Sequence, residues 1–176
     1  MLAFITTLRH PQNAADYGRV EALLRDTVAS LTQQSCDDYV VIIVGVRRPA
    51  FPLPERTVVV EVDFPPPSDL KGPRTGPASV IWDKGTKNGV GLIAARDFGP
   101  DYVMFVDADD FVHRNLATFV HARPGHAARR GGAGRVRGNV VGRRTIRHGR
   151  SGGADGGKTV GARIWSPGFV ISNNPI

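Results

Sequence analysis

The feature that most restricts the fold is an unbroken apolar run, YVVIIVGV, over residues 39–46. A strand with one face in water alternates apolar with polar side chains, whereas a strand covered on both faces is apolar throughout. Strands of the second kind belong to parallel sheets that have helices on both sides. The run therefore predicts a buried strand inside an α/β fold.

Three more apolar runs read as strands: LAFITTL at 2–8, TVVVEV at 57–62 and YVMFV at 102–106. Each is short, rich in β-branched or aromatic residues, and followed closely by Pro or Asp. A first helix is expected within residues 13–35, because apolar residues recur at helical spacing from Val20 to Leu31. Asn13 or Asp16 is available as its N-cap.

A second helix is expected from Asp83 to the stop at Gly99-Pro100, after a Gly- and Pro-rich loop over 71–77. Glycines at 85, 89 and 91 weaken this helix. The order β-α-β-β-α-β predicts an α/β domain with an open, mostly parallel sheet and flanking helices. Ligands of such sheets bind beyond the carboxyl ends of the strands, where RHP, DFPPP and DADD all follow strands. We therefore expect these three segments to share one cleft.

Asp107 and Asp109 form a D-x-D motif directly after the strand at 102–106, with Asp110 as a less certain third member. Two carboxylates one residue apart point the same way if the chain stays extended. A closely spaced oxygen pair suits a hard cation, Mn²⁺ or Mg²⁺, better than zinc. Mg²⁺ takes only one or two protein carboxylates and completes its shell with water and phosphate oxygens.

Three other interpretations of the acidic cluster can be compared with the sequence. An acidic turn that caps a following helix would need no ligand. A phosphatase of the haloacid-dehalogenase type also begins with D-x-D after an apolar strand, but its motif lies near the N-terminus. An EF-hand loop is excluded, because its glycine and glutamate positions are occupied by Val112 and Thr118.

The unit DKGTKNGVGLIAARDFGPDYVMFVDADD, over 83–110, resembles the family 2 glycosyltransferases of the GT-A fold. FITTLRHP and the helix after it resemble the first strand and helix of that family. The resemblance covers about residues 2–120. It implies a nucleotide-diphospho-sugar donor of the UDP- or GDP-sugar type and metal-dependent transfer of the sugar to an acceptor hydroxyl.

The resemblance also implies roles for individual residues. Asp107 and Asp109 would hold the metal. Residues implied in donor binding are Thr7, Asp63, Asp83, Lys84, Lys87 and Asp107. Solvated helix lysines remain an equal interpretation of Lys84 and Lys87, and an ordinary turn residue remains one for Asp63.

The chain departs from the family pattern in two places. GVRRP follows the second strand, where many members carry an acidic pair and Gly-Ser. Inverting members also need a catalytic carboxylate well after the D-x-D, and Asp155 is the only acid beyond Val120. No catalytic residue is therefore assigned, and it stays open whether the chain is an active enzyme.

The chain divides near residue 120 into a predicted nucleotide-sugar-binding domain, 1–120, and a tail, 121–176. Lys and Arg number 12 against 15 acids before that point, and 11 against one acid after it, which makes the net charge −3 and then +10. Of the 56 tail residues, 32 are Gly, Arg, Ala or Pro, so disorder or irregular structure is expected. A reading-frame shift in a GC-rich gene is the favoured explanation of this abrupt change.

The alternative function is a non-catalytic protein whose basic tail binds nucleic acid or anionic surfaces. Nucleic acid is the less favoured partner, because aromatic residues for base stacking are absent from the tail until Trp165. The P-loop pattern at 152–159 follows no buried strand and is interpreted as chance. A single cysteine, no long apolar run and no secretion signal indicate a cytoplasmic protein, or one peripheral at the membrane.

Overall fold

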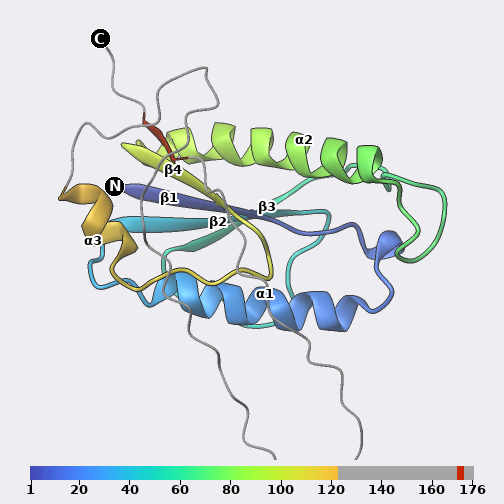
Figure 1. The fold of residues 1–176 in the computed structure, drawn as a ribbon, viewed down its shortest axis with the longest axis horizontal. Coiled ribbons are helices and arrows are strands. Elements are labelled where there is room, and N and C mark those ends of the chain that lie inside the picture. Colours follow the sequence, from blue (N-terminus) through green and yellow to red (C-terminus); the bar gives the residue numbers. More distant parts are fainter. Residues whose placement is uncertain (123–169, 173–176) are drawn as a thin grey trace, which may run out of the picture. The chain divides into compact units, whose positions relative to one another are not determined.

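The computed structural model describes residues 1–122 and 170–172. Four parallel strands form the body of the sheet: β1 Leu2–Thr7, β2 Tyr39–Gly45, β3 Thr57–Glu61 and β4 Tyr102–Val106. They are ordered β3-β2-β1-β4 (Figure 1). The prediction of an α/β fold with a mostly parallel sheet is confirmed.

Two long helices cover opposite faces of the sheet: α1 Tyr17–Thr32 on one face and α2 Pro77–Ala95 on the other (Figure 1). All seven residues of β2 are buried, as the unbroken apolar run predicts. Alternate side chains enter two core layers, so Val41 and Ile43 pack on the α1 side while Ile42 and Val44 pack on the α2 side. The sheet is therefore covered on both faces, and within residues 1–122 only its edges and strand ends remain open.

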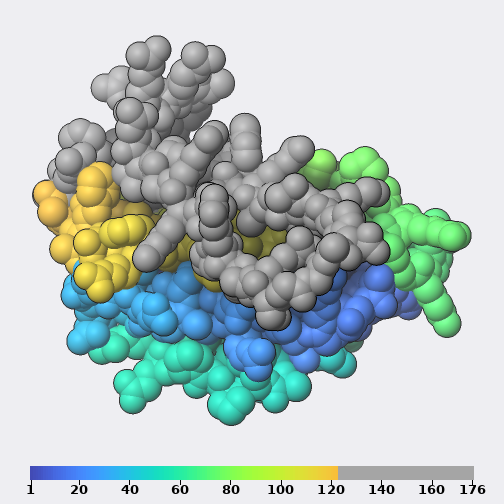
Figure 2. All heavy atoms as spheres, turned by 60° about the horizontal axis from the view of Figure 1, so that its bottom comes forward, coloured from blue at the N-terminus to red at the C-terminus, as the bar shows by residue number. Residues whose placement is uncertain are grey.

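Helix α1 begins as expected from its cap. The Asp16 carboxylate accepts a hydrogen bond from the Arg19 amide at 3.2 Å, which satisfies one of the free amides of the first turn. Leu24, Val28 and Leu31 are buried against the sheet. The opposite side of α1 forms the blue surface that comes forward in Figure 2.

Helix α2 begins at Pro77, six residues before the expected start at Asp83. Proline suits the first helical position because its missing amide hydrogen has no partner there in any case. The glycine at 91 has a packing reason, since an added Cβ would lie 2.5 Å from Ile5 Cγ2. The helix runs into η2 Arg96–Phe98 and stops at Gly99, whose φ is 58°.

Two elements were not expected. Helix α3, Leu116–His121, has Asn115 at its N-cap, so the acidic cluster at 107–110 does not cap it. Strand β5, Val170–Ser172, pairs antiparallel with β4, although no regular structure was expected in the tail. The remaining tail residues, including the P-loop pattern and Asp155, lie outside the described residues. Within the described part of the chain, no helix is both long and apolar enough to cross a membrane.

Candidate functional site

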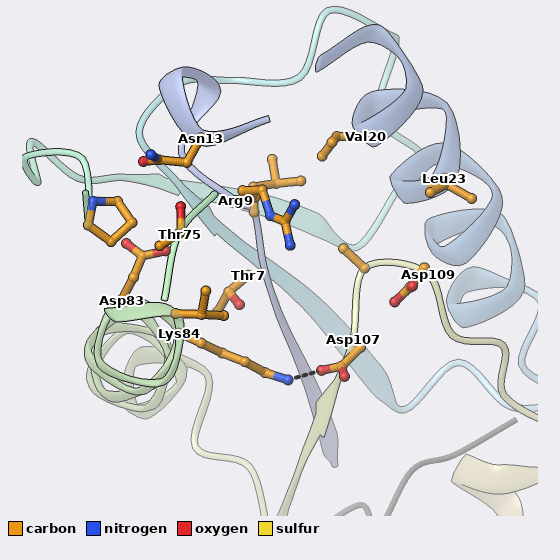
Figure 3. Close-up of a pocket in the computed structure, with 14 residues that line it drawn as sticks. Thr7, Arg9, Asn13, Val20, Leu23, Thr75, Asp83, Lys84, Asp107 and Asp109 are labelled. Atoms are coloured by element: carbon orange, nitrogen blue, oxygen red, sulfur yellow. Dashed lines mark hydrogen bonds and ion pairs between the residues drawn. The ribbon is translucent and has the colours of Figure 1, made fainter. Parts of the chain in front are cut away.

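A cavity of about 390 Å³ lies at the carboxyl ends of β1 and β4 (Figure 3). The chain passes from β1 to β2 on one side of β1, and β4 lies on the other side. Such a reversal leaves a crevice at the strand ends, where α/β proteins bind ligands. The volume is within the range of small-molecule sites.

The cavity brings together the three segments that follow strands. Arg9 from RHP, Pro67 from DFPPP, and Asp107 with Asp109 from DADD all line it. The expectation of one shared cleft is therefore confirmed. Helix α1 contributes Val20 and Leu23 as an apolar wall, and α2 contributes Val80 together with two charged residues, Asp83 and Lys84.

The D-x-D motif leaves β4 and turns at once. The Asp110 amide donates to the Asp107 carbonyl at 3.1 Å, which closes the turn. Asp107 and Asp109 both line the cavity, and Figure 3 shows them on the same loop. Burial, followed by the Asp107 and Asp109 carboxylates, raises the pKa of Asp110 above its ordinary value. Three carboxylates are thus crowded at one strand end.

Lys84 is the positive partner of this cluster. Its ammonium, on α2, forms an ion pair with the Asp107 carboxylate (Figure 3). Both side chains are about half exposed, at 45% and 47%. A ligand entering the cavity therefore meets a carboxylate that is already partly neutralised.

Lys87 occupies a different place from the phosphate-contacting one that the family resemblance implies. It is fully buried and does not line the cavity. Its ammonium donates to the Leu8 carbonyl and to the Asp83 carboxylate, each at 2.8 Å. Lys87 thus connects α2 to the end of β1 and orients Asp83, whose side chain is 13% exposed, at the cavity wall.

The two remaining residues expected to bind the donor differ in whether they line the cavity. Thr7, at the end of β1, lines the cavity, whereas Asp63 does not. Asp63 is exposed beyond β3, the edge strand, which β2 and β1 separate from β4 in the sheet. The strand order, which the sequence does not reveal, separates Asp63 from the crevice.

Three polar lining residues had no expected role in ligand binding: Arg9, Asn13 and Thr75. Arg9 belongs to RHP, which was expected at the cleft only as a segment. Asn13 belongs to η1, Pro11–Asn13, and is 1% exposed. The only signal for Asn13 was its proposed role as a helix cap, and Asp16 takes that role. Thr75 lies in the loop before α2, where a threonine has no distinctive pattern.

Asp107 and Asp109 are the lining carboxylates that follow β4 and could ligate a metal ion. In the described part of the chain, no group of three or more His, Cys, Asp or Glu side chains is placed to hold one. Two carboxylates, Asp107 and Asp109, are enough for Mg²⁺ or Mn²⁺ when phosphate oxygens and water complete the shell. The residues therefore fit a cation that arrives with a phosphate ligand, and they do not form an all-protein cage.

Compared with protein-family models and with the sequences of curated proteins, the chain gives no match.

Proposed function

We propose that this chain binds a nucleoside-diphosphate sugar in the cavity at the ends of β1 and β4, with Mn²⁺ or Mg²⁺ held by Asp107 and Asp109. The complete reaction would move the sugar to an acceptor hydroxyl. The observation that carries the proposal is that the D-x-D motif shares one cavity with Lys84, Asp83 and Thr7. The motif resemblance to GT-A glycosyltransferases supports the same ligand.

The charges of the cavity favour a phosphate ligand. Arg9 and Lys84 supply two cations that could contact phosphate oxygens. Asp107 and Asp109 would repel a bare diphosphate, so a divalent cation between the two groups removes the conflict. When bound, the cation would neutralise negative charge that develops on the departing nucleoside diphosphate.

The described residues support binding of the sugar donor, but they do not identify the base that the transfer step needs. Two of the three lining carboxylates already have cationic partners, because Asp83 pairs with Lys87 and Asp107 pairs with Lys84. Neither is assigned as the base that would deprotonate an acceptor. The first experiment therefore measures binding and not turnover.

Calorimetry with UDP and GDP, each with and without Mn²⁺, tests the proposal. We expect one nucleotide to bind only when Mn²⁺ is present, and at least about tenfold more weakly in Asp109→Ala. Asp97→Ala removes an exposed carboxylate in η2, away from the cavity lining, and should bind as the unaltered protein does. Failure of both nucleotides to bind in Mn²⁺ would contradict the proposal.

The second candidate, a basic protein that binds nucleic acid through residues 121–176, has only the charge of that segment in its favour. It would be supported if the full chain bound DNA with a steep dependence on salt and bound neither nucleotide.

A further inference from the structure

Asn13 presents a buried hydrogen-bond acceptor whose orientation is fixed. Its Nδ2 donates to the Ser68 carbonyl at 3.0 Å and to the Leu70 carbonyl at 2.8 Å. The reversed amide would place Oδ1 against these two carbonyl oxygens, which would repel it. Both amide hydrogens are therefore engaged, and only Oδ1 remains to meet a ligand.

Asn13 Oδ1 has no hydrogen-bond partner among the described residues, although it is buried. Buried acceptors in folded proteins are normally paired, so an unpaired one needs a physical explanation. Asn13 also lines the cavity. The Thr75 hydroxyl, on another loop that lines the same cavity, is likewise buried without a partner in the part of the chain described.

These two groups lie away from the acidic end of the cavity. Figure 3 shows Asn13 and Thr75 apart from the loop that carries Asp107 and Asp109. If the diphosphate binds with a cation at the acidic end, as the proposed function requires, the nucleoside extends toward the other end. The polar group that it presents there is the edge of its base.

We infer that Asn13 Oδ1 accepts a hydrogen bond from the ring N–H of a uracil or guanine base, and that the Thr75 hydroxyl donates to the carbonyl beside it. In both bases a ring N–H stands next to a carbonyl, so each unpaired protein group gains a partner. This inference rests on the proposed function, because the nucleotide must bind in this cavity. Exocyclic amines of cytosine or adenine could also supply a donor, so CDP and ADP belong in the test.

Asn13 has a second role that the test must separate. Gln12 Nε2 donates to the Ser68 and Asp69 carbonyls at 3.4 and 3.5 Å, and the Gly72 amide donates to the Gln12 carbonyl at 2.8 Å. Residues 12 and 13 thus jointly hold the loop over residues 68–72. A variant of Asn13 could weaken binding only because this loop shifts.

The experiment compares each nucleotide with a form methylated at the ring nitrogen: UDP with N3-methyl-UDP, and GDP with N1-methyl-GDP. Calorimetry in Mn²⁺ is run on the unaltered protein, Asn13→Ala and Gln12→Ala. We expect the unaltered protein to prefer UDP or GDP over its methylated form by about tenfold, which corresponds to about 1.4 kcal/mol. Asn13→Ala should lose this preference, and Gln12→Ala, which loosens the same loop but keeps Oδ1, should retain it.

Thr75→Val provides a second variant that needs no change in the loop contacts. It removes a buried hydroxyl without a partner in the described residues, so its thermal stability should be maintained or raised. We expect its affinity for the preferred nucleotide to fall about three- to tenfold. An unchanged affinity would overturn the assignment of the hydroxyl.

Several results would overturn the inference. They are equal binding of methylated and unmethylated nucleotides, a preference that survives in Asn13→Ala, and tighter binding of CDP or ADP than of UDP and GDP. If one of these appears while Asp109→Ala still weakens binding by at least about tenfold, the base assignment fails and the proposed function stands. If no nucleoside diphosphate binds, both fail.

Discussion

Lys84 on α2 and Asp107 at the end of β4 form an ion pair in the lining of the candidate site. The lysine ammonium contacts Asp107 Oδ1, a carboxylate oxygen that a metal held by the D-x-D motif would use as a ligand. Cation binding at Asp107 therefore competes with an internal charge.

Lys84→Met should bind Mn²⁺ alone more tightly than the unaltered protein. An exposed ion pair contributes about 0.2–1 kcal/mol, so removing the competitor should raise the Mn²⁺ affinity by up to about fivefold at low salt. Electron paramagnetic resonance of free Mn²⁺ measures this affinity. Lys71→Met, which changes an exposed lysine outside the cavity lining, is the matched control. Unchanged or weaker Mn²⁺ binding in Lys84→Met would show that the ammonium does not compete.

Lys87→Met should destabilise the fold strongly. The ammonium is fully buried between the Leu8 carbonyl and the Asp83 carboxylate, and removing it leaves both acceptors without this donor. Breaking a buried ion pair in this way costs about 3–5 kcal/mol. Urea unfolding measures the loss, with Lys84→Met, an exposed lysine one turn away, expected to lose less than about 1 kcal/mol. An equal loss of stability in Lys87→Met and Lys84→Met would show that burial of Lys87 does not make it more important for the fold.

Gly91→Ala and Gly85→Ala should change stability in opposite directions. A Cβ at 91 would lie 2.5 Å from Ile5 Cγ2, and overpacking of this kind costs about 1–3 kcal/mol. A Cβ at 85 meets nothing within 4 Å, so alanine there should stabilise α2 by up to about 1 kcal/mol. Thermal unfolding of the two variants gives the comparison. A neutral Gly91→Ala would mean that Ile5 can move aside.

His10 should make the fold less stable in mild acid. Burial, and then the nearby Lys87 ammonium, lower the pKa of His10 in the folded protein below its ordinary value of 6.5. As the pH falls through 6.5 the unfolded chain binds a proton that the folded chain resists, so stability decreases. His10→Gln should therefore lose less stability than the unaltered protein between about pH 7.5 and about pH 5. Urea unfolding at both values tests this, and a parallel loss in both proteins would exclude His10 as the cause.

Local patterns were sufficient to predict the main elements. The run over 39–46 predicted a doubly covered strand, and β2 is buried at every residue. Asp16 was one of two expected caps for α1, and it is the cap. The start of α2 was predicted at Asp83, six residues too late. Pro77 lies in a Gly- and Pro-rich stretch, and such a stretch indicates a loop even where its last proline begins a helix.

The cavity lining was predictable where a residue ends or closely follows a strand that borders the crevice, as with Thr7, Asp107 and Asp109. It was not predictable at Asp63, Lys87 or Asn13. Asp63 follows a strand as Asp107 does, yet β3 lies at the sheet edge. Lysines on helices are usually exposed, yet Lys87 is fully buried. Asn13 is oriented at the cavity by a hydrogen bond to Ser68, 55 residues away in sequence.

Periodicity and composition along the chain thus specified which segments are strands and helices, because burial repeats every two residues in a strand and about every 3.6 in a helix. Which of those segments are neighbours depends on contacts between residues far apart in sequence. Strand order and loop contacts therefore determined which residues line the cavity. Asn13 lines it, whereas Asp63 lies outside it and Lys87 is buried without lining it.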